Sequence, residues 1–213
     1  MRRLNRRLGK AERAQHRDGS LGTLRFAQPT KSAHSLLKIH PDFQPGVVVS
    51  IQVEIAILST GALKMTYVLS GDLDALRLPE VQPAGRADGL WQHTCFEAFI
   101  RAADSPAYRE FNFSPSGQWQ AYAFTDTRVG GLLQPAAEPL IECVAESGRL
   151  MPTLTLTATI HPADLPPGNA LRIGPAAVVE SAAGDIGYWA LQHAAGKPDF
   201  HHFDTFALEI ELT

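Results

Sequence analysis

Apolar and polar residues alternate along the chain from residue 47 onward. In VVVSIQVEIAIL (47–58), one strand face would hold Val49, Ile51, Val53 and Ile55. A Ser-Thr-Gly turn at 59–61 leads into LKMTYVL, where a second apolar face would hold Leu63, Met65, Tyr67 and Leu69. A period of two is typical of half-buried strands, so these segments predict a β-hairpin.

Further strand patterns follow over the rest of the chain. Three aromatic-rich segments, LWQHTCFEAFIR, YREFNFS and GQWQAYAFTD, are separated by turn sequences that contain Ser-Pro or Ser-Gly. The later strand candidates are PLIECVAE, LMPTLTLTATI, ALRIGPAAVVES, IGYWALQH and TFALEIELT. No convincing helical period of twelve or more residues appears in the body of the chain.

The number and spacing of these segments predict the fold class. Parallel neighbours need crossover connections of about a dozen residues or more, whereas the predicted strands follow one another at short spacing. We therefore predict an all-β fold, an antiparallel two-sheet β-sandwich of about ten strands with a jelly-roll-like topology. A chain of 213 residues can form one such domain.

Charge divides the chain into two parts. Residues 1–37 are polar and basic, and we expect a flexible extension there, with a basic arm for anionic partners as the alternative. Residues 38–213 form the predicted domain, in which acids outnumber bases. Because nucleic acids are bound mainly through clustered Lys and Arg, we expect no nucleic-acid partner for the folded domain.

Cysteine content and hydropathy bear on the cellular location of the protein. Cys95 and Cys143 are too few for a disulfide framework and lack the spacing of a zinc site, so we expect reduced thiols in the core. The basic start has no apolar run behind it, and nowhere do eighteen apolar residues follow one another. These features predict a cytoplasmic protein without a membrane partner, and they leave the oligomeric state open.

The first aromatic segment carries the candidate binding chemistry. Two-residue alternation would place Trp91, His93 and Glu97 on one face of a single strand. Polar groups on such a face are paired, solvated, or part of a ligand cavity, so a buried hydrogen-bond network is an equally good interpretation. Arg109 and Asn112 on the next segment are possible polar partners.

The sequence offers little support for catalysis. It contains no nucleophile elbow, zinc-protease motif, phosphate loop or C-x-x-C motif, so we expect no enzyme. Glu97, Glu110 and Glu180 leave open a glycosidase-like carboxylate pair, whose two groups would have to lie about 5 to 9 Å apart.

A histidine-rich loop near the carboxyl end is the second candidate site. It contains His193, His201 and His202 and follows Tyr188 and Trp189. Adjacent histidines on an extended strand face opposite ways, so we expect no metal centre. A single histidine could instead act as an axial haem ligand, or these side chains could satisfy loop backbone groups.

Together, WQHTCFEAFIR, YREFNFSPSGQWQAYAF and YWALQHAAGKPDFHH resemble the bacterial DOMON-like proteins, which are similar to family 9 carbohydrate-binding modules. The resemblance covers residues 38–212. It implies a jelly-roll sandwich that binds a sugar or, in other branches, haem. It also implies Trp91 as a stacking platform and Glu97 as a hydroxyl acceptor, with Trp189 as a second aromatic face.

The resulting functional expectation is a non-catalytic domain that binds a carbohydrate or related small molecule. The site would comprise Trp91, His93, Glu97, Arg109, Asn112 and Trp189. No cofactor is expected. One alternative is a haem-binding or redox-linked domain, and another is a structural or interaction protein that has lost ligand binding.

Overall fold

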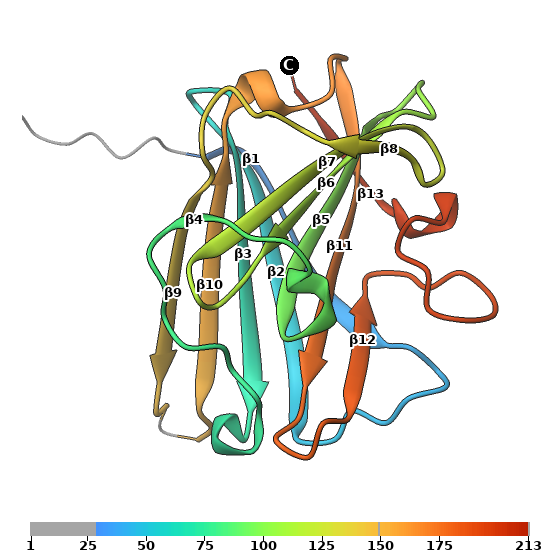
Figure 1. Cartoon of the computed structure of the whole chain (residues 1–213). Coiled ribbons are helices and arrows are strands. Elements are labelled where there is room, and N and C mark those ends of the chain that lie inside the picture. The colour runs from blue at the N-terminus through green and yellow to red at the C-terminus, as the bar shows by residue number, and fades with distance from the viewer. Residues whose placement is uncertain (1–28, 149, 213) are drawn as a thin grey trace, which may run out of the picture.

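The computed structural model describes residues 29–148 and 150–212, in which all regular structure consists of strands and short 3₁₀ helices (Figure 1). The 3₁₀ helices are η1 (Leu73–Ala75), η2 (Leu90–Gln92), η3 (Pro162–Asp164) and η4 (Phe203–Thr205). The strands are β1 (Pro29–Ile39), β2 (Val48–Leu58), β3 (Leu63–Gly71), β4 (Gly85–Arg86), β5 (Cys95–Ala102), β6 (Tyr108–Phe113), β7 (Gln118–Asp126), β8 (Val129–Leu132), β9 (Leu140–Glu146), β10 (Thr153–Ile160), β11 (Ala170–Glu180), β12 (Ile186–Ala190) and β13 (Leu208–Glu211). The predicted all-β class is confirmed.

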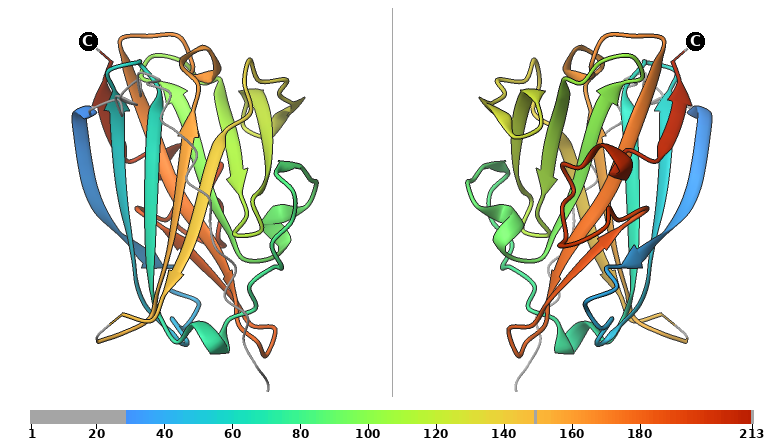
Figure 2. Two further views of the ribbon diagram at one scale, coloured as in Figure 1. Left: turned by 90° about the vertical axis from the view of Figure 1, so that its left-hand side faces the viewer. Right: turned by 90° about the vertical axis from the view of Figure 1, so that its right-hand side faces the viewer.

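The strands form one continuous, curled sheet. Its hydrogen-bonded order is β4-β7-β6-β5-β11-β12-β1-β2-β3-β10-β9, with β8 added on β7 and β13 on β11. Most neighbours are antiparallel, whereas β4 pairs with β7 in parallel. The expectation of two separate sheets is therefore not met, because β1 joins the two halves of a half-barrel (Figure 2).

β1 connects these halves by pairing with a strand of each. Its residues up to Leu37 pair with β2, whereas Lys38 and Ile39 pair with β12. We call β2, β3, β9 and β10 with the first part of β1 the β2 half. The β5 half comprises β4–β8 and β11–β13.

The core lies where the two halves face each other. Met65 and Leu69 on β3 and Phe111 on β6 are fully buried in one apolar cluster. The hydroxyl of Tyr67 on β3 crosses this layer and donates a 2.7 Å hydrogen bond to the backbone carbonyl of Glu97 on β5. That bond ties the two halves together directly beneath the outer face of β5.

The predicted hairpin is confirmed by the antiparallel pairing of β2 with β3. Its inward face was predicted correctly except at Val49, which is 64% exposed. The register shifts between Val48 and Ser50, so Val48 takes the buried position instead. A bulge places one extra residue in a strand and thereby reverses the side-chain alternation beyond it.

The predicted extension overlaps the fold, because β1 begins at Pro29 and pairs with β2. The remainder of that extension, residues 1–28, lies outside the described residues. Cys95 is buried, Cys143 is half-buried, and both are free thiols. None of the helices in the described ranges has the length and apolarity required to cross a membrane.

Candidate functional site

The outer face of the β5 half, opposite the core, carries polar and aromatic side chains in register. Glu97 on β5 lies directly across from Asn112 on β6, and Phe99 lies across from Glu110. Side chains at such positions project to the same face and contact one another. Strand pairing thus brings together carboxyl, amide and ring groups that are far apart in the sequence.

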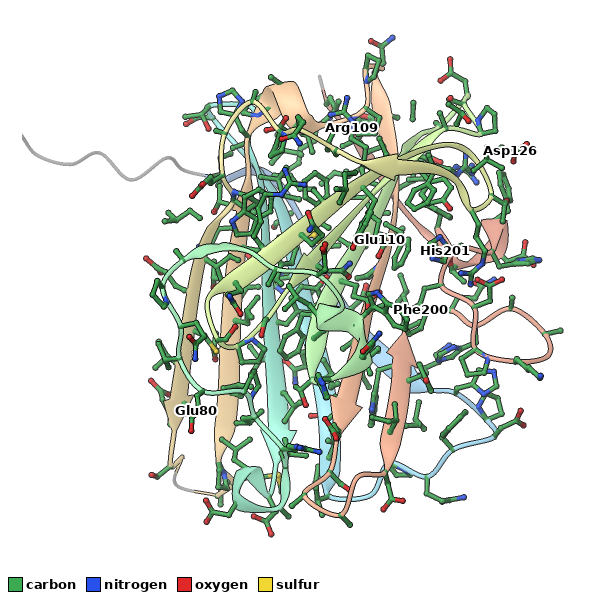
Figure 3. The ribbon with its side chains drawn as sticks, in the orientation of Figure 1. Glu80, Arg109, Glu110, Asp126, Phe200 and His201 are labelled. Carbon is green, nitrogen blue, oxygen red and sulfur yellow. The ribbon has the colours of Figure 1, made fainter. Side chains whose placement is uncertain are left out.

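This face forms the floor of a pocket of about 560 Å³. Segments from β5–β8, β11, β12, η2 and the loop after β12 surround it. Figure 3 shows Glu110, Phe200 and His201 close to one another in this region, with Arg109 farther toward the upper end. The lining residues are Trp91, Glu97, Phe99, Glu110, Tyr122, Phe124, Arg128, Gly130, Gly131, Val178, Tyr188, Pro198, Asp199, Phe200 and His201.

Trp91 borders the pocket from η2 and not from β5, contrary to the predicted single strand. Gly89 precedes η2 with a φ of 72°, a left-handed conformation that glycine adopts without a steric penalty. β5 begins only at Cys95, beyond the 3₁₀ turn. As a result, the indole of Trp91 is half-exposed at the edge of the pocket.

Glu97 lies at the floor of the pocket and is only 3% exposed. Its Oε1 has no hydrogen-bond partner, and neither has Oδ1 of Asn112 on the facing strand. Burial, together with the nearby charge of Glu110, raises the pKa of Glu97 well above its ordinary value. Two buried oxygen acceptors therefore lie at adjacent positions without a donor between them.

Glu110 is the second carboxyl group of the pocket. Asn112 donates a 2.7 Å hydrogen bond from Nδ2 to Oε1 of Glu110. Burial raises the pKa of Glu110, and the hydrogen bond from Asn112 partly offsets that rise. Nε2 of His201 lies 3.7 Å from the other carboxyl oxygen, Oε2.

Hydrogen bonds fix the orientation of His201. The backbone N–H of Arg128 donates to the hydroxyl oxygen of Tyr108 over 3.0 Å, and that hydroxyl lies 2.7 Å from Nδ1 of His201. Nδ1 of His201 thus faces the hydroxyl of Tyr108, and Nε2 faces Glu110. Burial and the charge of Arg128 lower the pKa of His201 to about 4.

Three of the predicted site residues lie elsewhere. His93 follows η2 and places its Nδ1 2.7 Å from Oε2 of Glu180, a carboxylate that Arg77 also contacts. Arg109 points to the opposite side of β6 from Glu110, where its Nη1 lies 3.4 Å from the carbonyl oxygen of Ala163 in η3. Trp189 is 4% exposed and belongs to the core, so the predicted second aromatic face is not supplied by it.

Asn112 is fully buried beneath the pocket and reaches it through Glu110. Of the six predicted residues, the pocket brings together Trp91 and Glu97. The predicted binding site lacked the wall residues Tyr122, Phe124 and Phe200, and it treated Tyr188 and His201 as part of a separate candidate site in the histidine-rich loop. Alternation along β7 does place Tyr122 and Phe124 on one face, but only the strand order reveals that this face borders β5 and β6.

The histidines of the loop have separate partners within the protein. His193 and His202 bond within their own surroundings, to the carbonyl of Lys38 and to the backbone N–H of Asp204 respectively. His201 has Nδ1 2.7 Å from the hydroxyl of Tyr108 and Nε2 3.7 Å from a carboxyl oxygen of Glu110. Across residues 29–148 and 150–212, no group of three or more His, Cys, Asp or Glu is placed to hold a metal ion.

Comparison with known proteins supports the fold only. No protein-family model matches the chain, and no curated protein sequence matches it significantly. A solved structure at 2.70 Å resolution, of a candidate carbohydrate-binding protein from Bacteroides uniformis ATCC 8492, is similar with a TM-score of 0.59. The match covers 80% of this chain and 82% of that protein at 13% sequence identity. The chain thus shares its overall fold with this protein.

Proposed function

We propose that this protein is a non-catalytic domain that binds a carbohydrate or a related small molecule in the pocket of the β5 half. The observation that carries the proposal is a half-exposed indole, Trp91, bordering the same cavity as the unpaired carboxyl group of Glu97. Concave sites with aromatic walls and a few polar groups are typical of small-molecule binding.

A sugar ring matches this combination of groups. The apolar face of a pyranose can stack on an aromatic ring, while its hydroxyl groups donate to oxygen acceptors at the ring edge. Glu97 lines the pocket, and its Oε1 lacks a hydrogen-bond partner within the protein. The fold shared with a candidate carbohydrate-binding protein gives independent support.

The same proposal includes the finer relationship drawn from the sequence motifs, that of a DOMON-like protein related to family 9 carbohydrate-binding modules with jelly-roll topology. Trp91 and Glu97, the two residues on which that resemblance rests most heavily, border one pocket. Their proximity supports the assignment without requiring His93, Arg109 or Trp189 to contact the ligand.

Glycoside hydrolysis is a second candidate, because Glu97 and Glu110 line one pocket on adjacent strands. Hydrolysis by a carboxyl pair needs one group protonated and the other ionised. Burial raises the pKa of both groups here, so their surroundings do not shift the two pKa values in opposite directions, and we favour binding. Release of reducing sugar from oligosaccharides by the wild-type protein, but not by Glu110→Gln, would contradict the non-catalytic assignment.

Tryptophan emission tests the binding proposal, because Trp91 alone among the three tryptophans is exposed, while Trp119 and Trp189 are buried. Titration with mono- and oligosaccharides should change the emission saturably. The change should vanish in Trp91→Ala and persist in Phe203→Ala, which removes an exposed ring outside the pocket. If no sugar changes the emission or the melting temperature, the carbohydrate proposal is wrong.

A further inference from the structure

We propose that the pocket of the β5 half selects a ligand with a protonated amine, such as an amino sugar, over a neutral sugar. This inference deepens the proposed function and rests on the same pocket. Three features support it: a wall of aromatic rings, a buried carboxyl group without a partner, and basic side chains that already have partners.

The wall of the pocket is built largely from ring faces and edges. Six aromatic side chains line it, from five different parts of the fold: Trp91, Phe99, Tyr122, Phe124, Tyr188 and Phe200. Aromatic faces attract organic cations through the ring quadrupole, and the attraction grows as water is excluded. Neutral sugars stack on one or two rings, whereas a cage of several rings suits an ammonium group.

The floor supplies a carboxyl group that a bound cation can ionise. Glu97 lines the pocket and is only 3% exposed, and its Oε1 receives no hydrogen bond. Glu110, which also lines the pocket, is its diagonal neighbour on β6. A protonated amine provides both the missing donor and a compensating charge, whereas a hydroxyl provides only the donor.

The basic side chains at the pocket do not fill this role. Among the described lining residues these are Arg128 and His201. Nη2 of Arg128 bonds to Oδ1 of Asp199 at 2.8 Å, and His201 is held neutral by burial, with its Nδ1 bonded to Tyr108. The position in front of Glu97 therefore matches a cation brought by the ligand.

Proton linkage follows from the surroundings of Glu97. The titratable groups next to it are Glu110 on β6, Cys95 on β5 and Tyr67 beneath it, and Tyr122 on β7 lines the same pocket. Across the pocket lie Arg128, Asp199 and His201. Because burial favours the protonated form of Glu97, a bound cation must ionise it, and binding releases a proton. Affinity for a permanently charged cation should therefore rise with pH.

Calorimetric titrations test the selection. The probes are D-glucosamine, its neutral counterparts N-acetyl-D-glucosamine and D-glucose, and choline, whose charge does not change with pH. We expect D-glucosamine to bind at least about tenfold more tightly than either neutral sugar at pH 6.5, in line with a charge-assisted hydrogen bond. Choline should bind more tightly at pH 8 than at pH 6, with proton release that depends on the buffer.

Two variants isolate the carboxyl group. Glu97→Gln keeps the shape of the side chain and should reduce the preference for D-glucosamine to about onefold. Glu142→Gln, which removes an exposed carboxylate on β9 of the β2 half, should leave the preference unchanged. An unchanged melting temperature, or a higher one, for Glu97→Gln shows that the variant is folded.

The outcomes separate this inference from the proposed function. Neutral sugars that bind as tightly as D-glucosamine overturn the amine selection and leave carbohydrate binding intact. Choline binding that depends on Glu97, without binding of any sugar, supports a cation site and overturns carbohydrate binding. If none of the four probes binds, both proposals are wrong.

Discussion

Replacing Glu97 by glutamine should stabilise the protein at alkaline pH. Burial and the charge of Glu110 raise the folded-state pKa of Glu97 above its unfolded value. Below the unfolded-state pKa near 4.5, Glu97 is protonated in both states and its burial costs no stability. As pH rises from there through the folded-state pKa, the unfolded state ionises first, and the free energy of unfolding falls. The amide stays neutral, and its Nε2 can donate to the unpaired Oδ1 of Asn112 on the facing strand.

The size of the gain follows from the unpaired groups. A buried polar group without a partner costs about 1–3 kcal/mol, so Glu97→Gln should raise the free energy of unfolding by about that amount at pH 8. At pH 4, where the carboxyl group is protonated, the difference should be near zero. In a domain of this size each kcal/mol changes the melting temperature by about 2–4 °C.

Urea denaturation of wild type, Glu97→Gln and the exposed control Glu142→Gln at pH 4, 6 and 8 measures this difference. The gain should grow with pH for Glu97→Gln alone. A variant that is less stable than wild type at pH 8, or a gain that does not depend on pH, would refute the assignment of Glu97 as a buried and unpaired carboxyl group.

Three further predictions concern the frame around the pocket. Tyr67→Phe removes the hydrogen bond to the carbonyl of Glu97 that joins the two halves, and should lower the free energy of unfolding by about 1–3 kcal/mol in urea titration because the carbonyl stays buried; an unchanged value argues against that bond. His201, with a pKa of about 4, should remain neutral from pH 5 to 8 in NMR titration, and unfolding should become easier as pH falls from about 6.5 toward 4; a midpoint near 6.5 contradicts this. Thr205→Val removes a buried hydroxyl that lies 2.7 Å from the carbonyl of Phe200, so amide hydrogen exchange should accelerate in the loop 198–204; unchanged protection contradicts this role.

Local strand geometry was predictable where alternation is regular. The inward faces of β2 and β3 follow the sequence pattern except at the bulge between Val48 and Ser50. The sequence pattern does not indicate this bulge, because it depends on how β2 pairs with β3. The 3₁₀ turn at Trp91 was missed for a related reason. The packing of η2 on β5 and β6 determines both the exposure of Trp91 and the start of β5 at Cys95.

The sheet path and the pocket wall needed long-range information. Two separate sheets were expected because short loops predict antiparallel pairs, yet the pairing of Lys38 with Ala190 links β1 to β12 across 152 positions of the chain. Phe200 and His201 reach the pocket from a loop, where no residue period exists to indicate direction. Arg109, by contrast, could have been rejected from alternation alone, because it shares a face with Phe111.

The contribution of Trp91 to ligand affinity tests the central claim most directly. A tryptophan side chain offers about 250 Å² of surface, and about half of that is exposed here. A sugar that covers about half of the exposed part buries about 60 Å², which corresponds to about 1.5 kcal/mol, or about tenfold in affinity. Calorimetric titration of wild type, Trp91→Ala and Phe203→Ala with the best-binding sugar measures this ratio. If the sugar binds in the pocket of the β5 half, the affinity should fall about tenfold in Trp91→Ala and stay unchanged in Phe203→Ala. Equal affinity in all three proteins would contradict this binding site.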